Sequence, residues 1–165
     1  MKRSKAKVVD AEIGIQRPQV GALCWRMHRG HVEVLLITSR DTGRWVIPKG
    51  WPIEGKTPAQ SAALEAWEEA GVKGQIQDQA LGRYTYDKAR IPRPPTPCAV
   101  SVFPLRVEGL ATKFPEREER RRKWFAAAKA ARKVAEPELR TLLAAVGEDA
   151  TLVLPDGLKG PVDGA

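Results

Sequence analysis

The chain has 165 residues, of which 42% are hydrophobic and 29% charged, and its formal net charge is +8 at pH 7. That length fits one domain with a core of its own, and no apolar run reaches the roughly 18 residues that a membrane-spanning helix needs. The positive charge favours an anionic partner, such as a nucleotide, another polyphosphate or a nucleic acid.

Cysteine usage and the start of the chain indicate a cytoplasmic protein. The first seven residues are basic, but no apolar signal core follows them. Cys24 and Cys98 lie far apart in apolar, strand-like runs. This is typical of buried, reduced thiols rather than of a disulfide framework or a zinc site.

The first part of the chain predicts a tail followed by strands. Residues 1–16 form a basic tail that we expect to be flexible. Segments 20–27 and 32–38 are apolar and contain β-branched residues, and a turn at 29–31 should join them as a hairpin. A short strand at 44–48 ends at a proline.

A helix should follow the loop at 49–57. Thr57 is a suitable N-cap, and Pro58 is a suitable first helical residue because its missing N–H is not needed there. Gly71 can adopt the left-handed conformation at which many helices end. The sequence therefore predicts a helix between Pro58 and Gly71.

The remainder predicts further strands and a helical end. Because strands bracket a central helix and a helix closes the chain, we expect a mixed α/β sandwich rather than a regular strand–helix alternation. The folded domain should span residues 17–146, and the Gly- and Pro-rich segment 147–165 should be a loose tail. The expected elements are strands at 75–86, 98–107 and 122–125, a loop at 87–97, and one or two helices covering 126–134 and 137–146.

Three carboxylates lie in the last two turns of the predicted helix. Glu65, Glu68 and Glu69 are spaced i, i+3 and i+4, so they share one face, where like charges repel. They also lie near the helix C-terminus, where the macrodipole disfavours anions. A solvated acidic face would account for them, and so would a divalent cation, since hard Mg²⁺ or Mn²⁺ binds carboxylate oxygens and substrate phosphates. In the second case the natural reaction is metal-assisted hydrolysis at phosphorus.

The stretch around these acids resembles the Nudix box, G-x5-E-x7-R-E-U-x-E-E-x-G-U, in which U is aliphatic. Two positions depart from the pattern, because Lys56 replaces the first glutamate and Leu64 replaces the arginine. Segments 35–40, 45–50 and 122–125 are also similar to those of the branch that hydrolyses diphosphoinositol and diadenosine polyphosphates. The matching box positions are Gly50, Glu65, Glu68, Glu69, Gly71 and Val72, with the small Ala66 at the first U.

The resemblance implies a Nudix-type α/β/α sandwich with a mixed sheet and a loop–helix–loop catalytic box. It implies Mg²⁺ or Mn²⁺ at Glu65, Glu68 and Glu69, and a metal-polarised water that attacks a pyrophosphate linkage. One of these glutamates, or an acid from elsewhere, would act as the base. Candidates for an additional acid are Asp87, Glu108 and Glu116.

Basic residues around the box are the phosphate ligands that the resemblance implies. Each of them could instead be a solvated surface charge. The expected substrate-binding residues are Arg17, Ser39, Arg40, Lys49 and Gly50, together with Lys88, Arg90 and Arg93 in the proline-rich loop.

The same segment also satisfies a competing pattern. Gly50 to Thr57 fits G-x-x-x-x-G-K-[ST], the phosphate-binding P-loop, in which Lys56 would reach phosphates and Thr57 would hold Mg²⁺. However, strand 44–48 is short and ends in proline, and Pro52 fills a loop that needs small residues. A P-loop would also leave the three glutamates without a role.

A third interpretation is a catalytically weak Nudix-like module that binds a nucleotide or RNA. The charge and the two departures from the box favour it, but the sequence lacks the aromatic platform with interleaved basic residues that single strands require. Our leading prediction is a cytoplasmic, Mg²⁺- or Mn²⁺-dependent hydrolase of a phosphoanhydride bond in a nucleoside, dinucleoside or diphosphoinositol polyphosphate. We expect no membrane partner and do not favour nucleic acid, and the sequence is compatible with a homodimer.

Overall fold

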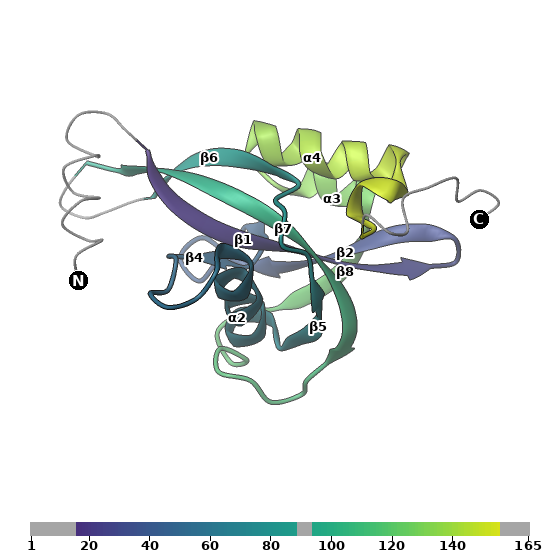
Figure 1. Ribbon diagram of the computed structural model, residues 1–165, viewed down its shortest axis with the longest axis horizontal. Coiled ribbons are helices and arrows are strands. Elements are labelled where there is room, and N and C mark those ends of the chain that lie inside the picture. Colours follow the sequence, from purple (N-terminus) through teal and green to yellow (C-terminus); the bar gives the residue numbers. More distant parts are fainter. Residues whose placement is uncertain (1–15, 89–93, 156–165) are drawn as a thin grey trace.

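The computed structural model describes residues 16–88 and 94–155, which form one sheet with helices on both of its faces (Figure 1). The strands are β1 (Arg17–His28), β2 (His31–Thr38), β3 (Trp45–Val46), β4 (Lys49–Gly50), β5 (Val72–Ile76), β6 (Gly82–Lys88), β7 (Thr96–Leu110) and β8 (Arg122–Ala126). The helices are α2 (Pro58–Ala70), α3 (Ala127–Lys133), α4 (Pro137–Glu148) and the short 3-10 helix η1 (Ala150–Val153).

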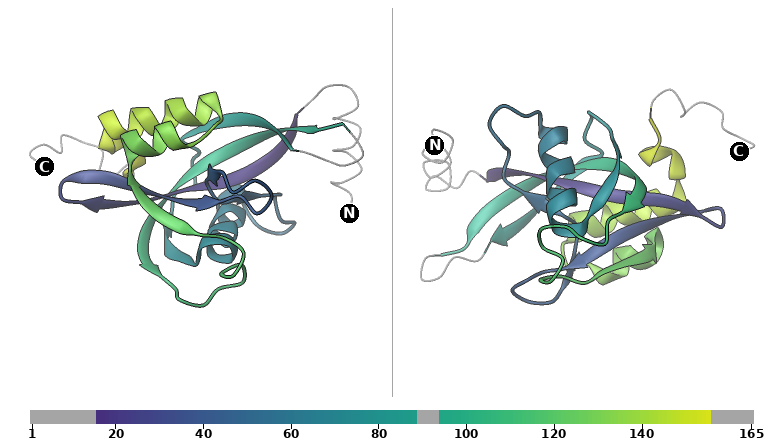
Figure 2. Two further views of the ribbon diagram at one scale, coloured as in Figure 1. Left: turned by 180° about the vertical axis from the view of Figure 1, so that it is seen from behind. Right: turned by 90° about the horizontal axis from the view of Figure 1, so that it is seen from below.

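The sheet is mixed, as the sequence predicted. Its main path has the order β3-β2-β1-β7-β5; in addition, β4 pairs with β1, β6 with β7 and β8 with β2. Strands β1 and β7 run parallel, and the other pairings in the described residues are antiparallel. Figure 2 shows α2 on one face of this sheet and α3 with α4 on the other, which confirms the α/β/α sandwich.

Alternation along the strands supplies two separate cores. Successive side chains of a strand point to opposite faces, and the neighbours Leu23 and Cys24 of β1 are both fully buried. Leu23 belongs to the core beneath α3 and α4, whereas Cys24 belongs to the core beneath α2. A strand that is buried on both faces has a continuous apolar sequence, which explains why the sequence predicted a strand in this segment.

Helix α2 begins and ends where its sequence predicts. The Thr57 side chain accepts a hydrogen bond from the Gln60 N–H at 3.1 Å, and the Gln60 side chain accepts one from the Thr57 N–H at 2.9 Å. This reciprocal capping box satisfies two free donors of the first turn. At the other end Gly71 has φ 67°, the left-handed conformation expected of it.

Alanines bring α2 close to the sheet. The side chains of Ala62, Ala66 and Ala70 are completely buried, and that of Ala59 nearly so. Because these side chains are small, the helix backbone can lie near β1 and β4. The glutamates of the helix are thereby carried to the strand backbone.

The expected single strand at 75–86 is wrong, because the chain forms two strands there. Residue Ile76 is paired with Leu105 and Gly82 with Val102, so residues 77–81 face only two residues of β7. One of those two is Pro104, which has no N–H to donate to a ladder. The surplus residues therefore bend away between β5 and β6.

The C-terminal part of the described chain is packed rather than loose. Residues 147–155, assigned from sequence to a loose tail, contain the end of α4 and the whole of η1. Val153 is fully buried in the core under α4, and its carbonyl accepts a hydrogen bond from the Gln77 side chain. The expected tails at 1–15 and 156–165 lie outside the described residues.

A cation from β8 closes the C-terminus of α2. Arg122 donates hydrogen bonds of 2.7 Å to the carbonyls of Ala70 and Ala111, and its guanidinium lies 4.8 Å from the centroid of the Phe114 ring. Positive charge is favourable at a helix C-terminus, and α2 has no basic residue in its last turn. Arg122 of β8 therefore supplies the positive charge that the last turn of α2 lacks.

Replacing Arg122 with methionine should destabilise the protein, because two carbonyls lose charged donors. We expect a loss of about 2 kcal/mol, which corresponds to a melting temperature lower by about 4–8 °C for a domain of this size. Differential scanning calorimetry would measure the shift, with exposed Lys113→Met, in the connection between β7 and β8, as the control. Equal melting temperatures for Arg122→Met and wild type would contradict the capping role.

Candidate active site

A glycine in β4 allows a glutamate of α2 to lie against the strand backbone. Gly50 pairs with Val20 of β1, which fixes its place at the sheet. A Cβ atom added to Gly50 would lie 2.3 Å from the Glu65 Cδ and 2.4 Å from its Oε2. The Glu65 carboxyl thus occupies the space of a side chain at position 50, and only glycine permits this approach.

Glu69 joins Glu65 one helical turn later. Glu69 is a buried residue, and its Oε1 accepts a hydrogen bond from the Lys49 N–H at 3.3 Å. The carboxyls of Glu65 and Glu69 also lie close enough to each other for a hydrogen bond between them. Such a bond requires one of the two groups to hold a proton.

Burial and mutual repulsion explain why this pair retains a proton. Burial, followed by the negative charge of Glu69, raises the pKa of Glu65 to about 8. Burial also raises the pKa of Glu69, but Arg120 and Lys49 oppose this by favouring the charged form. The two carboxyls therefore titrate as a coupled pair, and a cation could take the place of the shared proton.

The carboxyl pair has the right chemistry for a hard divalent cation, which binds oxygen ligands and keeps several waters. Glu68 lies on the same helix face, and its charge contributes to the raised pKa of Glu65. Within the described residues, however, no group of three or more His, Cys, Asp or Glu side chains is arranged to hold a metal ion. The structure brings Glu65 and Glu69 together and does not place Glu68 in a three-acid group with them.

The connection between β7 and β8 contributes a further acid. The Glu116 N–H donates to the Glu68 carbonyl at 2.9 Å, and the Glu116 charge raises the pKa of both carboxyls of the buried pair. Of the three additional acids expected from sequence, Glu116 lies beside the box. Of the other two, Glu108 pairs with Arg106 at 3.9 Å and Asp87 is exposed in β6.

Arg120 is a site residue that the sequence reasoning missed. Its Nη2 lies 3.6 Å from Glu69 Oε2, and its Nε donates to Glu116 Oε1 at 2.8 Å. It belongs to a run of mixed charge that resembles ordinary solvated surface. The available signal was its i, i+4 spacing from Glu116, with which it forms an ion pair across a turn.

Two expected phosphate ligands lie beside aromatic rings near the box. The Lys49 Nζ is 4.8 Å from the centroid of Tyr86, and burial lowers the pKa of this lysine while Glu69 opposes that shift. The Arg17 guanidinium lies 4.6 Å from the centroid of Trp51. In the described part of the chain, the buried Nε of Arg17 has no hydrogen-bond partner, so a donor remains unsatisfied there.

The other expected ligands are less closely tied to the box. Arg40 is exposed and forms a 2.9 Å ion pair with Glu119, a hydrogen bond that raises the arginine pKa. The Ser39 N–H donates to the Arg44 carbonyl at 2.7 Å and thereby forms part of the turn after β2. Lys88 is exposed at the end of β6. The positions of Arg90 and Arg93 fall outside the described residues.

The geometry of the loop does not fit a P-loop. Strand β4 has only two residues and is antiparallel to β1, whereas a P-loop follows a buried parallel strand. Lys56 is exposed, and the Thr57 hydroxyl is used as the helix cap. Leu64, at the position of the box arginine, is half-buried.

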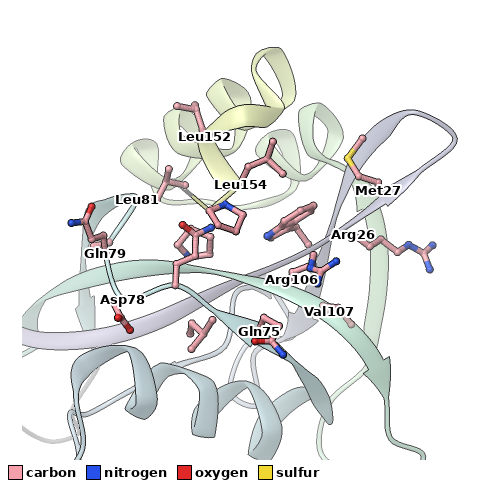
Figure 3. A pocket seen from close by; sticks show the side chains of 16 residues that line it. Arg26, Met27, Gln75, Asp78, Gln79, Leu81, Arg106, Val107, Leu152 and Leu154 are labelled. Atoms are coloured by element: carbon pink, nitrogen blue, oxygen red, sulfur yellow. The ribbon is translucent and has the colours of Figure 1, made fainter. Parts of the chain in front are cut away.

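A cavity of about 1190 Å³ lies away from the box (Figure 3). It is lined by the end of β1, by the β5–β6 connection including Gln79 and Leu81, and by Leu152 and Leu154 near the C-terminal end of the described chain. None of the box glutamates lines it. The candidate chemistry therefore belongs to the acidic cluster at β4 and α2.

Comparison with known proteins gives relatives for most of the folded region. The model of the NUDIX domain matches residues 16–146. Nudix hydrolase 21, chloroplastic, of Arabidopsis thaliana is 34% identical over 119 residues, which cover 69% of this chain and 58% of the relative. Diphosphoinositol polyphosphate phosphohydrolase 3-alpha of Mus musculus is 30% identical over 126 residues, which cover 75% of this chain and 71% of the relative.

Solved structures show the same fold. The crystal structure of the C. elegans Ap4A hydrolase has a TM-score of 0.55 at 21% identity, covering 78% of this chain and 94% of that one.

No helix in the described residues is long and apolar enough to cross a membrane. The chain spans 49–63% of the length of the first three curated relatives. Since the match to the domain model covers most of the sequence, this chain belongs to the Nudix family.

Proposed function

We propose that this chain is a divalent-cation-dependent hydrolase that cleaves a phosphoanhydride bond in a polyphosphorylated small molecule. The observation that carries the proposal is the carboxyl pair of Glu65 and Glu69, which lies against Gly50 and the Lys49 N–H. Two carboxyls in contact share one proton, and the free energy lost by keeping them together is recovered when a cation binds between them.

The residues around the pair support distinct roles. Glu65 and Glu69 would hold Mg²⁺ or Mn²⁺, with Glu68 as a further ligand or a support. The bound cation would polarise a water and neutralise charge on the phosphate. Glu116, beside the box, is a candidate to accept the proton of that water, and so is a box glutamate that is not bound to the cation.

The cations beside the box support a polyphosphate substrate. Lys49 and Arg17 lie at one side, and the unpartnered Nε–H of Arg17 is a donor that a phosphate oxygen would satisfy after a small opening of the site. Arg40, Lys88 and the remaining basic residues of the loop would form a rim. Because the murine relative is a diphosphoinositol polyphosphate phosphohydrolase, diphosphoinositol and dinucleoside polyphosphates are the first substrates to test. A cytoplasmic location remains part of this proposal.

A catalytically weak binding module is the second candidate. It is favoured by Lys56 and Leu64 at two box positions, and by the absence of a three-acid group in the described residues. Such a domain would bind the same polyphosphates without turning them over. The first experiment below separates the two.

A substrate panel tests the proposed reaction directly. Purified protein would be incubated with nucleoside, dinucleoside and diphosphoinositol polyphosphates, with Mg²⁺, with Mn²⁺ and with EDTA, and the products identified by mass spectrometry. We expect cleavage at a phosphoanhydride bond that stops when EDTA removes the cation. Binding without turnover of any member would favour the binding module.

Neutral replacements of the box glutamates should reduce turnover while leaving the fold intact. We expect Glu65→Gln, Glu68→Gln and Glu69→Gln each to lower kcat at least about 100-fold, because each removes charge needed at the cation or at the proton acceptor. Exposed Glu118→Gln is the matched control. Lys56→Ala should change kcat only a few-fold, although it would abolish activity in a P-loop. Normal turnover by the Glu68→Gln/Glu69→Gln double variant would refute the assignment.

The buried pair also predicts how stability depends on pH without metal. The pKa of Glu65 rises from an ordinary 4.5 to about 8 on folding, so between these values the native state holds a proton that the unfolded chain has released. Stability should therefore be present at low pH and fall as pH rises through this range. Thermal melts in EDTA should give a lower melting temperature at pH 9 than at pH 6, with a smaller difference in Glu65→Gln. An unchanged difference in Glu65→Gln would contradict this origin.

A further inference from the structure

Arg120 is a buried cation with three partners drawn from different parts of the chain. Its Nη2 contacts Glu69 at 3.6 Å, its Nε donates to Glu116 at 2.8 Å, and its Nη1 donates to the Thr38 carbonyl at 3.1 Å. Its side chain is 9% exposed, compared with 11% for Glu69 and 21% for Glu116. It joins α2, the β7–β8 connection and the end of β2 at one point.

The site needs such a cation because α2 has none. The thirteen residues of α2 include three glutamates and one glutamine but no lysine or arginine. Leu64 occupies the position at which the Nudix pattern has an arginine. Burying a carboxylate without a partner is costly. Glu69 faces the Glu65 carboxyl, the Lys49 N–H and the Arg120 guanidinium, and the charges of Lys49 and Glu116 also act on it.

The contacts of Arg120 are suited to orienting its acidic partners. A guanidinium is planar and presents donors in fixed directions, so anchoring two of its nitrogens fixes where the third points. The Thr38 carbonyl and Glu116 are those anchors, and Glu69 is the third partner. The neighbouring Arg121 N–H donates a hydrogen bond to the Thr38 Oγ1 at 2.9 Å, which holds the same connection against β2.

We propose that Arg120 is the positioning residue of the site, holding the Glu69 carboxylate against β4 and Glu116 beside it, in place of a cation on the helix. This inference rests on the proposed hydrolase function. Arg120 acts through the two acids and is not itself a catalytic residue. Metal binding would then require the acids to stay where Arg120 holds them.

A double-mutant cycle in metal-free protein tests the contact itself. Arg120→Met keeps an unbranched apolar side chain and removes the charge, so Glu69 is left buried without its ion-pair partner, and we expect the melting temperature to fall by about 5–10 °C. Adding Glu69→Gln removes the stranded charge. The loss in the double variant should therefore be smaller than the sum of the two single losses by at least about 3 °C.

Kinetics separate positioning from a purely structural role. With a substrate identified in the panel, we expect Arg120→Met to lower kcat roughly 10- to 100-fold, because a displaced carboxylate misplaces the reacting groups, and to change KM less than about threefold. Arg120→Lys should recover part of kcat, since it keeps the charge but not the planar fork. Arg117→Met, an exposed neighbour in the same connection, should match wild type.

The outcomes are distinct. Coupling in the cycle with a fall in kcat at nearly constant KM supports the inference. Additive melting temperatures would overturn it, and so would coupling with an unchanged kcat, which would make Arg120 merely structural. If the wild type turns over no polyphosphate, the proposed function fails, and with it the positioning role that rests on it, whereas an active Arg120→Met variant removes only the inference.

Discussion

The contact between Glu65 and the backbone of Gly50 is the constraint on which the site depends. It places a carboxyl where a side chain of β4 would otherwise lie, and Glu69 follows one turn later into the same buried space. Two consequences follow from burying acids in this way. The pair retains a proton well above the usual pH for a carboxylic acid, and it has a strong electrostatic preference for any cation that can replace that proton.

Most of the structure around the pair serves either to bring it to the strand or to compensate its charge. The alanine face of α2 lets the helix lie close to the sheet, and the capping box and Gly71 fix where the helix starts and stops. The compensating groups come from outside the helix. Arg122 of β8 closes its C-terminus, and Arg120 of the preceding connection contacts Glu69. The connection between β7 and β8, together with the first residue of β8, therefore acts on both the stability of the helix end and the electrostatics of the site.

Local signals predicted the elements well where one segment determines its own structure. The ends of α2 are fixed by Thr57, Pro58 and Gly71 through bonds made within a few residues. Strand β1 is buried on both faces, so its continuous apolar sequence predicts a strand without reference to its neighbours. The prediction of one continuous strand at 75–86 was wrong because the break between β5 and β6 depends on the neighbouring strand β7. Pro104 lies on β7, and nothing within 75–86 reveals that five residues there face only two.

The sequence by itself determined the spacing of Glu65, Glu68 and Glu69, the glycine at position 50 and the resemblance to the Nudix box, because helical periodicity and a short motif are local properties. Only the tertiary structure decided which acids meet. It joined Glu65 to Glu69, placed Glu116 beside them, and brought in Arg120, which follows Glu69 by 51 residues in the sequence. Those contacts depend on the positions of β7 and β8 in the sheet. The charged residues of segment 116–123 do not reveal this strand order, because their pattern is typical of solvent-exposed surface.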